Sequence, residues 1–224
     1  MFYAVFVQPE SPGNIGTLAR LMKNFDIGQL VLVDPCDITQ ETYKFAVHAK
    51  DIVDSAITVD TLEEALSMID ISVGTTSVSS TVYKVAITPE ELVKNIDRDG
   101  SIGIIIGRES NGLTREELLS CDIVATIPTS EEYPTLNAAV AGGILFYEIY
   151  NAIESSPMKP RLNKQEKDLL IKDFNRIVDK VERREHKNRI SKVIFKRIIG
   201  RGFIASRESH SLKGILAKVL KKLD

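Results

Sequence analysis

Residues 104–118, IIIGRESNGLTREEL, contain a complete strand, loop and helix. The β-branched apolar start predicts a buried strand that ends at Gly107, and Thr114-x-x-Glu117 is a capping box that predicts the start of a helix. A strand that leads through a short loop into a helix is the repeating unit of an α/β sheet. Ligands bind at the carboxyl ends of the strands in open sheets of this kind, so the loop is a candidate binding segment.

The same alternation of short apolar runs and amphipathic segments continues in both directions along the chain. Strands are predicted at residues 3–7, 30–33, 69–74, 102–107 and 123–127. Helices are predicted at residues 14–24 and 136–153, and after two further capping boxes, Thr61-x-x-Glu64 and Thr88-x-x-Glu91. Near-continuous apolarity in several strands indicates that both faces are covered, as in parallel sheets with right-handed crossovers. Residues 1–154 are therefore expected to form an α/β domain.

A second domain is predicted beyond a short linker. Residues 155–160, SSPMKP, combine two serines with two prolines and show no hydrophobic periodicity, which is typical of a linker. Residues 161–224 then carry three apolar runs at helical spacing, which begin at Leu169, Ile190 and Leu212. Three amphipathic helices with Lys and Arg on their outer face predict a small, basic helical domain.

The formal net charge of −2 hides two oppositely charged parts. Residues 1–159 carry 10 Lys and Arg against 23 Asp and Glu, whereas residues 160–224 carry 19 Lys and Arg against 8 Asp and Glu. A basic module of this kind favours binding to a polyanion, and nucleic acid is the first candidate. Two simpler possibilities stay open: the basic residues keep a helical tail in solution, or the tail docks on the acidic part of the chain.

The composition excludes several classes of protein. With 43% hydrophobic and 27% charged residues, the chain is neither collagen-like nor broadly disordered. Cys36 and Cys121 are the only cysteines and have no Cys or His neighbour at metal-ligand spacing, so we expect no metal site and a reducing cytosol. The N-terminus lacks a basic start, and no apolar stretch is long enough to span a bilayer. We therefore expect a cytoplasmic protein without a membrane partner.

Three segments contain polar residues that the fold alone does not require. They are residues 8–20 (QPESPGNIGTLAR), 107–114 (GRESNGLT) and 127–137 (IPTSEEYPTLN), and each follows a predicted strand. Taken singly, each has a plain structural role: Asn14 caps a helix, Arg20 lies on the surface, and Thr135 or Asn137 caps the last helix of the domain. The second segment lacks the Lys-Ser/Thr of a phosphate loop and the GxGxxG pattern of dinucleotide sites, which argues against enzymes of those two kinds.

Together, the three segments resemble the motifs of the SpoU (TrmH) family of RNA 2′-O-ribose methyltransferases. The resemblance extends over residues 2–150, and the motifs occur in the family's order, each at the end of a strand. The IPTSxEYPxLN form of the third motif and the helical C-terminal part resemble the TrmJ branch, which modifies the ribose at tRNA position 32. The resemblance implies a trefoil-knotted SPOUT domain, S-adenosylmethionine as methyl donor, and a homodimer in which each site draws on both copies.

The resemblance also implies roles for particular residues. The catalytic set comprises Arg20, Asn14, Glu109, Thr135 and Asn137, and the cofactor pocket comprises Thr75, Thr76, Gly107, Glu109, Ile127, Thr135 and Leu136. In this assignment Arg20 acts at the ribose hydroxyl and the adjacent phosphate, while Glu109 and Asn137 hold the loops in place. The chain departs from the family in two places: Thr135 stands where Ser is usual, and no basic residue lies between the GTT turn at residues 74–76 and Lys84.

The expected function is therefore S-adenosylmethionine-dependent methylation of a cytidine or uridine ribose in tRNA, at nucleotide 32 of the anticodon loop. Two alternatives stay open at this point: methylation of another tRNA or rRNA position, and an RNA-binding relative without catalytic activity. A small-molecule enzyme with a doubly wound sheet is disfavoured by the basic C-terminal part and by the missing phosphate-loop glycines.

Overall fold

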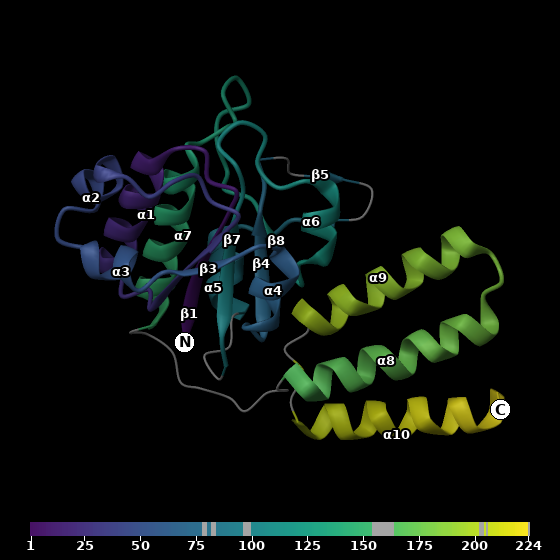
Figure 1. Ribbon diagram of the computed structural model, residues 1–224. Helices are drawn as coiled ribbons and strands as arrows, with labels where there is room; N and C mark the ends of the chain where they lie inside the picture. Colours follow the sequence, from purple (N-terminus) through teal and green to yellow (C-terminus); the bar gives the residue numbers. More distant parts are fainter. Residues whose placement is uncertain are drawn as a thin grey trace. The chain divides into compact units, whose positions relative to one another are not determined.

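The computed structural model describes residues 1–77, 80–81, 84–95, 100–153, 164–201, 204 and 206–223. The chain divides into two compact units, Met1–Pro157 and Met158–Asp224. Figure 1 shows the first as a sheet flanked by helices and the second as a group of helices. The predicted linker at residues 155–160 lies outside the described residues, so the domain boundaries stay predictions.

A six-stranded parallel sheet forms the centre of the first unit. Its strands are β1 (Phe2–Val7), β2 (Gln29–Val33), β3 (Ile57–Val59), β4 (Ile71–Thr75), β7 (Ile102–Ile106) and β8 (Ile123–Ala125), in the spatial order β3-β2-β1-β7-β4-β8. The five predicted strands are confirmed, with ends that shift by one or two residues. β3 carries no buried apolar run that would have predicted it, since two of its three residues are exposed. A separate antiparallel pair joins β5 (Ser80–Thr81) to β6 (Lys84–Val85).

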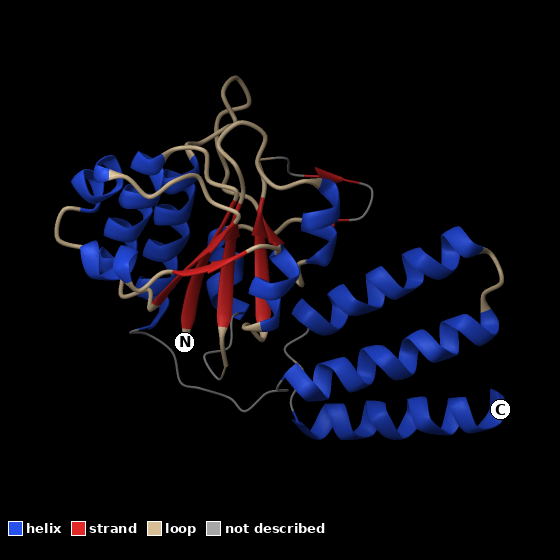
Figure 2. Cartoon of the chain, viewed as in Figure 1, coloured by secondary structure: helices blue, strands red, loops and turns tan. Residues whose placement is uncertain are grey.

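Helices cover both faces of the sheet, as Figure 2 shows. α1 (Pro12–Asn24), α5 (Pro89–Asn95) and α7 (Ala138–Ile153) lie on one face, and α4 (Leu62–Ser67) and α6 (Arg115–Ser120) lie on the other. Successive residues of β1 alternate between the two cores: Phe6 lies in the core with α1 and α7, whereas Val5 and Val7 lie in the core with α4 and α6. α2 (Gln40–Ala46) and α3 (Lys50–Asp54) pack on α1 and were not indicated by the hydrophobic pattern.

The predicted capping boxes form at two helices in full and at a third in part. Thr114 and Glu117 exchange hydrogen bonds between side chain and backbone at the start of α6. Thr88 and Glu91 do the same at α5. At α4, the Thr61 hydroxyl accepts a hydrogen bond from a first-turn amide, which is half of the box.

Asn14 is not the N-cap of α1, so that prediction is wrong. The helix begins at Pro12, and Ser11 is its N-cap residue in an extended conformation. Pro is well suited to the first helical position because its φ is already helical and its missing N–H would have no partner there. Asn14 therefore lies inside the first turn, where its side chain can reach other loops.

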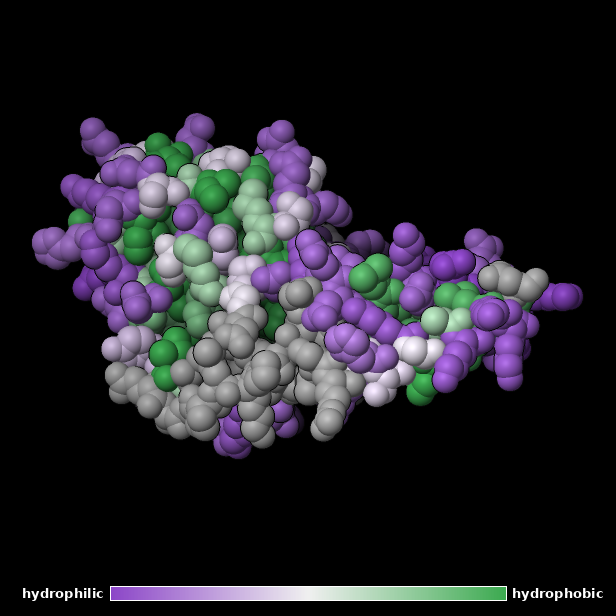
Figure 3. All heavy atoms as spheres, turned by 90° about the horizontal axis from the view of Figure 1, so that it is seen from below, coloured by the Kyte–Doolittle hydropathy of each residue, from purple (hydrophilic) through white to green (hydrophobic). Residues whose placement is uncertain are grey.

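The second unit consists of α8 (Lys164–Val181), α9 (Glu185–Arg201) and α10 (Ser206–Leu223), which confirms the three predicted helices. α8 packs against both other helices, and the rings of Phe174 and Phe195 stack with their centroids 3.7 Å apart. Hydrophilic side chains cover much of the surface of this unit that is visible in Figure 3. Across the described ranges of both units, no helix is long and apolar enough to cross a membrane.

Candidate active site

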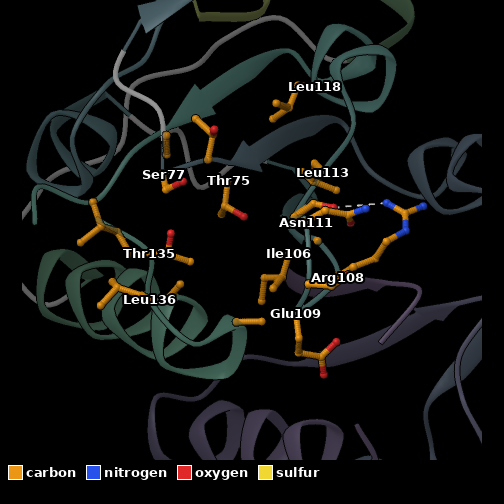
Figure 4. Close-up of a pocket in the computed structure, with 18 of the residues that line it drawn as sticks. Thr75, Ser77, Ile106, Arg108, Glu109, Asn111, Leu113, Leu118, Thr135 and Leu136 are labelled. Atoms are coloured by element: carbon orange, nitrogen blue, oxygen red, sulfur yellow. Dashed lines mark hydrogen bonds between the residues drawn. The ribbon is translucent and has the colours of Figure 1, made fainter. Parts of the chain in front are cut away.

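A cavity of about 400 Å³ lies at the carboxyl ends of β4, β7 and β8. Its volume is within the range of about 300–1,000 Å³ that is usual for small-molecule sites. All seven residues predicted for the cofactor pocket line it: Thr75, Thr76, Gly107, Glu109, Ile127, Thr135 and Leu136. The structure thus brings residues from three distant loops to one space (Figure 4).

Apolar side chains and hydroxyl groups share the wall of the cavity. Ile106, Leu113 and Leu118 line it together with Leu136, and none of the first three belongs to the predicted pocket. The Thr75 hydroxyl donates a hydrogen bond to the carbonyl of Ile105 (2.9 Å), which fixes this side chain at the end of β4. An apolar pocket with a few fixed polar groups is the usual form of a site for a small organic ligand.

Two glycines hold the loop after β7 in a tight turn. A Cβ at Gly107 would lie 2.2 Å from the carbonyl carbon of Gly112, so any other residue would force the two sides of the loop apart. Gly112 has a φ of +68°, in the left-handed region that favours glycine. The Gly112 amide donates to the carbonyl of Arg108 (3.0 Å) and closes the turn.

Arg108 fixes this loop, although the motifs assigned it no role. Its guanidinium donates to both carboxylate oxygens of Glu117 (3.0 and 2.9 Å), to the Gly112 carbonyl (3.2 Å) and to the Gln8 side-chain oxygen (2.6 Å). The two side chains of the ion pair are only 16% and 18% exposed, and bidentate pairs of this kind restrict geometry strongly. In Figure 4 the Arg108 side chain points away from the space between Thr75 and Leu136, so we assign it a positioning role.

The ion pair shifts the pKa of both partners. Burial alone would raise the pKa of Glu117, but hydrogen bonds from Arg108 and from the Thr114 amide outweigh burial and lower this pKa below its ordinary value. The hydrogen bond to Glu117 raises the pKa of Arg108, which therefore stays protonated. A carboxylate whose pKa is lowered by folding stabilises the fold above its unfolded-state pKa, and that contribution is lost as the pH falls through its folded-state pKa.

The Glu109 carboxylate joins the second motif to the first. It accepts hydrogen bonds from the backbone amides of Glu10 (2.8 Å) and Ser11 (3.1 Å) and from the side-chain amide of Asn14 (2.9 Å). An ionised carboxylate only accepts hydrogen bonds, and the start of a helix offers both donors and a partial positive charge. In Figure 4 the carboxylate points away from the cavity, so its role is to hold the loop before α1.

Asn14 extends this network to the third motif. The Asn137 Nδ2 group donates to Asn14 Oδ1 (3.1 Å), and Asn137 Oδ1 accepts from the Val140 amide (3.2 Å) as the cap of α7. That helix begins at Ala138, two residues later than predicted. Both amide side chains thus use their nitrogen and their oxygen, and the chain of bonds from Glu109 through Asn14 to Asn137 ties all three motifs together.

The predicted catalytic set is divided by the structure. Glu109 and Thr135 line the cavity, whereas Asn14 and Asn137 lie outside it and connect loops. Arg20 is exposed on α1 and does not line the cavity of its own chain. Six residues of helix place it about 9 Å further along the axis than Asn14.

Metal ligands are not gathered at this site. Within the ranges that the structure describes, no group of three or more His, Cys, Asp or Glu side chains is placed to hold a metal ion.

The α/β unit matches a known family. The model of the SpoU rRNA Methylase family matches residues 1–147. The chain belongs to this family.

Relatives of the SpoU family match both units. A Methanocaldococcus jannaschii protein named tRNA (cytidine-2′-O-)-methyltransferase TrmJ is 39% identical over 95% of this chain and 96% of its own length. A Pseudomonas aeruginosa protein named tRNA (cytidine/uridine/adenosine-2′-O-)-methyltransferase TrmJ is 32% identical over 97% of this chain and 93% of its own length. The crystal structure of TrmJ from Z. mobilis has a TM-score of 0.74 at 26% identity and covers 98% of this chain and 99% of that one.

These comparisons confirm the predicted SpoU family and its TrmJ-like branch. They also confirm the parallel α/β fold with a helical C-terminal part. The chain is therefore a methyltransferase of the SpoU family, and the trefoil knot stays a prediction.

We expect Glu117→Gln to destabilise the fold in a pH-dependent way. At neutral pH the substitution removes the charge that pairs with Arg108, so the free energy of unfolding falls. The difference from the unchanged protein shrinks as the pH drops below the ordinary Glu pKa of 4.5, because Glu117 then becomes protonated as well. Urea denaturation over this pH range measures it, with the exposed Glu116→Gln on the same helix as control. A difference that is independent of pH would contradict the proposed ion pair.

Proposed function

We propose that this chain transfers a methyl group from S-adenosylmethionine to the 2′-hydroxyl of cytidine or uridine 32 in the anticodon loop of tRNA, in the cytoplasm. The observation that carries the proposal is that residues of the second and third SpoU motifs line one cavity, while hydrogen bonds from Asn14 to Glu109 and Asn137 tie the first motif to them. The names of the relatives that match both units support tRNA as substrate. Position 32 rests on the likeness of the third motif to the TrmJ branch.

The lining of the cavity suits S-adenosylmethionine. The purine and carbon chain of this molecule need apolar surface, which Leu113 and Leu136 offer, and its hydroxyl and amino-acid groups need polar partners, which Thr75 and Thr135 offer. The absence of a side chain at Gly107 lets the two sides of the loop after β7 come together, and this closed loop forms part of the cavity wall. When bound, the sulfonium supplies an already activated methyl group.

We infer that Arg20 serves the cavity of a second copy of the chain. Arg20 lies outside the cavity of its own chain, although Asn14 of the same motif is bonded to the loops that line the cavity. Val140, Tyr147 and Tyr150 on α7 are 46%, 49% and 39% exposed, and the Phe25 ring packs against both tyrosine rings at 5.9 and 6.2 Å. Exposed groups of large apolar side chains mark association surfaces, which supports a homodimer through this face.

In this proposal Arg20 stabilises negative charge and does not act as a base. A guanidinium stays protonated in proteins, so it cannot accept the hydroxyl proton. It binds the ribose oxygen and the adjacent phosphate and stabilises the alkoxide as it develops, while a phosphate oxygen accepts the proton. Holding the oxygen in line with the methyl carbon supplies a large part of the rate enhancement, about 7–11 kcal/mol in favourable cases.

The C-terminal unit supplies phosphate contacts. Its Lys and Arg residues attract the RNA backbone regardless of sequence, and this attraction weakens with salt. The reaction itself selects RNA over DNA, since only RNA has a 2′-hydroxyl.

Labelled methyl transfer to unmodified tRNA, followed by mass spectrometry of the modified nucleotide, tests the proposed function. We expect one 2′-O-methylated nucleotide, at position 32. A modified nucleotide elsewhere in tRNA or in rRNA would contradict the position, and S-adenosylmethionine-independent RNA binding without transfer would support the catalytically silent alternative.

Arg20→Lys should lower turnover about 100-fold or more, the usual loss when one charge-stabilising donor is removed. Lysine keeps the charge but loses the planar fork that bonds two oxygens together. Lys23→Arg is the matched control on the same helix, where the side chain pairs with Asp51. Near-normal turnover in Arg20→Lys would contradict the geometric role.

Reversal of charge in the C-terminal unit should weaken tRNA binding and leave cofactor binding unchanged. The variant combines Arg183→Glu with Lys187→Glu, both at exposed positions near the turn between α8 and α9. The slope of log K for tRNA association against log salt concentration should become shallower by about one for each RNA phosphate that the variant no longer binds. The same change of net charge at Lys50 and Lys94, in the acidic unit, is the control. Equal reductions of tRNA affinity in both variants would contradict a specific role of the C-terminal unit.

A further inference from the structure

Glu10 and Glu109 form reciprocal hydrogen bonds between the loop before α1 and the loop after β7. Glu109 accepts from the amides of Glu10 (2.8 Å) and Ser11 (3.1 Å), while Glu10 accepts from the Ser110 amide (3.0 Å) and from the Ser110 hydroxyl (2.6 Å). Each loop therefore presents a carboxylate to backbone amides of the other. Glu10 and Ser110 are 100 residues apart in the sequence, and nothing in the motifs assigns a role to either.

The two loops belong to different functions of the proposed site. Residues 107–113, the cavity loop, line the cavity, and Ser110 is among these lining residues. Glu10 lies two residues before Pro12, where α1 begins, and α1 carries Arg20. The hydrogen bonds between the two loops therefore connect the position of the cavity loop to that of α1, which bears Arg20, the proposed RNA-contacting residue.

Hydrogen bonds at two consecutive residues restrict the cavity loop more than bonds at a single residue would. Glu109 alone would let the loop pivot about a single residue, whereas bonds at both Glu109 and Ser110 also fix the direction of the peptide between them. Hydrogen bonds to an ionised carboxylate are short and stronger than neutral ones, as the 2.6 Å contact of the Ser110 hydroxyl illustrates. Glu10 and Ser110 are both exposed, so water competes for these bonds and they can open.

We propose that Glu10 is a positioning residue that, with Ser110, holds the cavity loop in its donor-binding shape and couples that loop to α1. The identity of the donor rests on the proposed function, whereas the coupling of the loops does not. Glu10 touches neither donor nor RNA in this account and acts only through Ser110.

Two measurements on the full chain test the proposal. Hydrogen exchange of the amides in the cavity loop, without any ligand, should be faster in Glu10→Ala. Calorimetric titration should show S-adenosylmethionine binding weakened about three- to tenfold in Glu10→Ala, the range for an exposed charge-assisted hydrogen bond. Ser110→Ala loses the hydroxyl bond but keeps the amide bond to Glu10, so it should have a smaller effect in the same direction, and the double variant should be no worse than Glu10→Ala alone. Glu116→Ala, an equal change of charge at an exposed position of α6, should change neither measurement.

The outcomes separate this proposal from the proposed function. Additive effects in the double variant, or unchanged exchange in Glu10→Ala, would overturn the positioning role. If the unchanged protein bound no S-adenosylmethionine, the proposed function would fail, while faster exchange in Glu10→Ala would still support the coupling of the loops.

Discussion

A deprotonated carboxylate can only accept hydrogen bonds, and the Glu109 carboxylate accepts three from the first turn of α1 and the loop before it. One of these donors, Asn14, accepts in turn from Asn137, so a single chain of bonds connects segments more than 90 residues apart. Polar groups that satisfy one another therefore tie together loops that are distant in the sequence.

The parallel sheet makes this arrangement possible. All six strands run in one direction, so the loops after β1, β7 and β8 emerge at the same edge. The role of each side chain then depends on whether it faces the cavity or points away from it. Thr75 and Leu136 face the cavity, whereas the Arg108 and Glu109 side chains point away from it and hold the backbone from outside. The wall of the cavity is therefore preformed before a ligand binds.

Local signals in the sequence predicted the elements, and tertiary contacts decided the rest. Buried β-branched runs such as residues 102–106 and capping pairs such as Thr114 with Glu117 identify strands and helices because their causes are local. β3 could not be found in this way, since its residues are mostly exposed. Local sequence predicts Asn14 as a helix cap, but its actual partners, Glu109 and Asn137, are distant in the sequence. The pairing of Arg108 with Glu117 could not be predicted from local sequence either, because it requires the closed loop between them.

The central claim is that the loops after β7 and β8, tied to the loop before α1, form part of one donor site. A crystal structure with S-adenosylmethionine bound tests this claim most directly. The account predicts the donor between Thr75, Gly107 and Leu136, with the Glu109–Asn14–Asn137 bonds intact and Arg20 of a partner copy near the methyl group. A donor bound elsewhere, or Glu109 detached from Asn14 when the donor is in place, would contradict it.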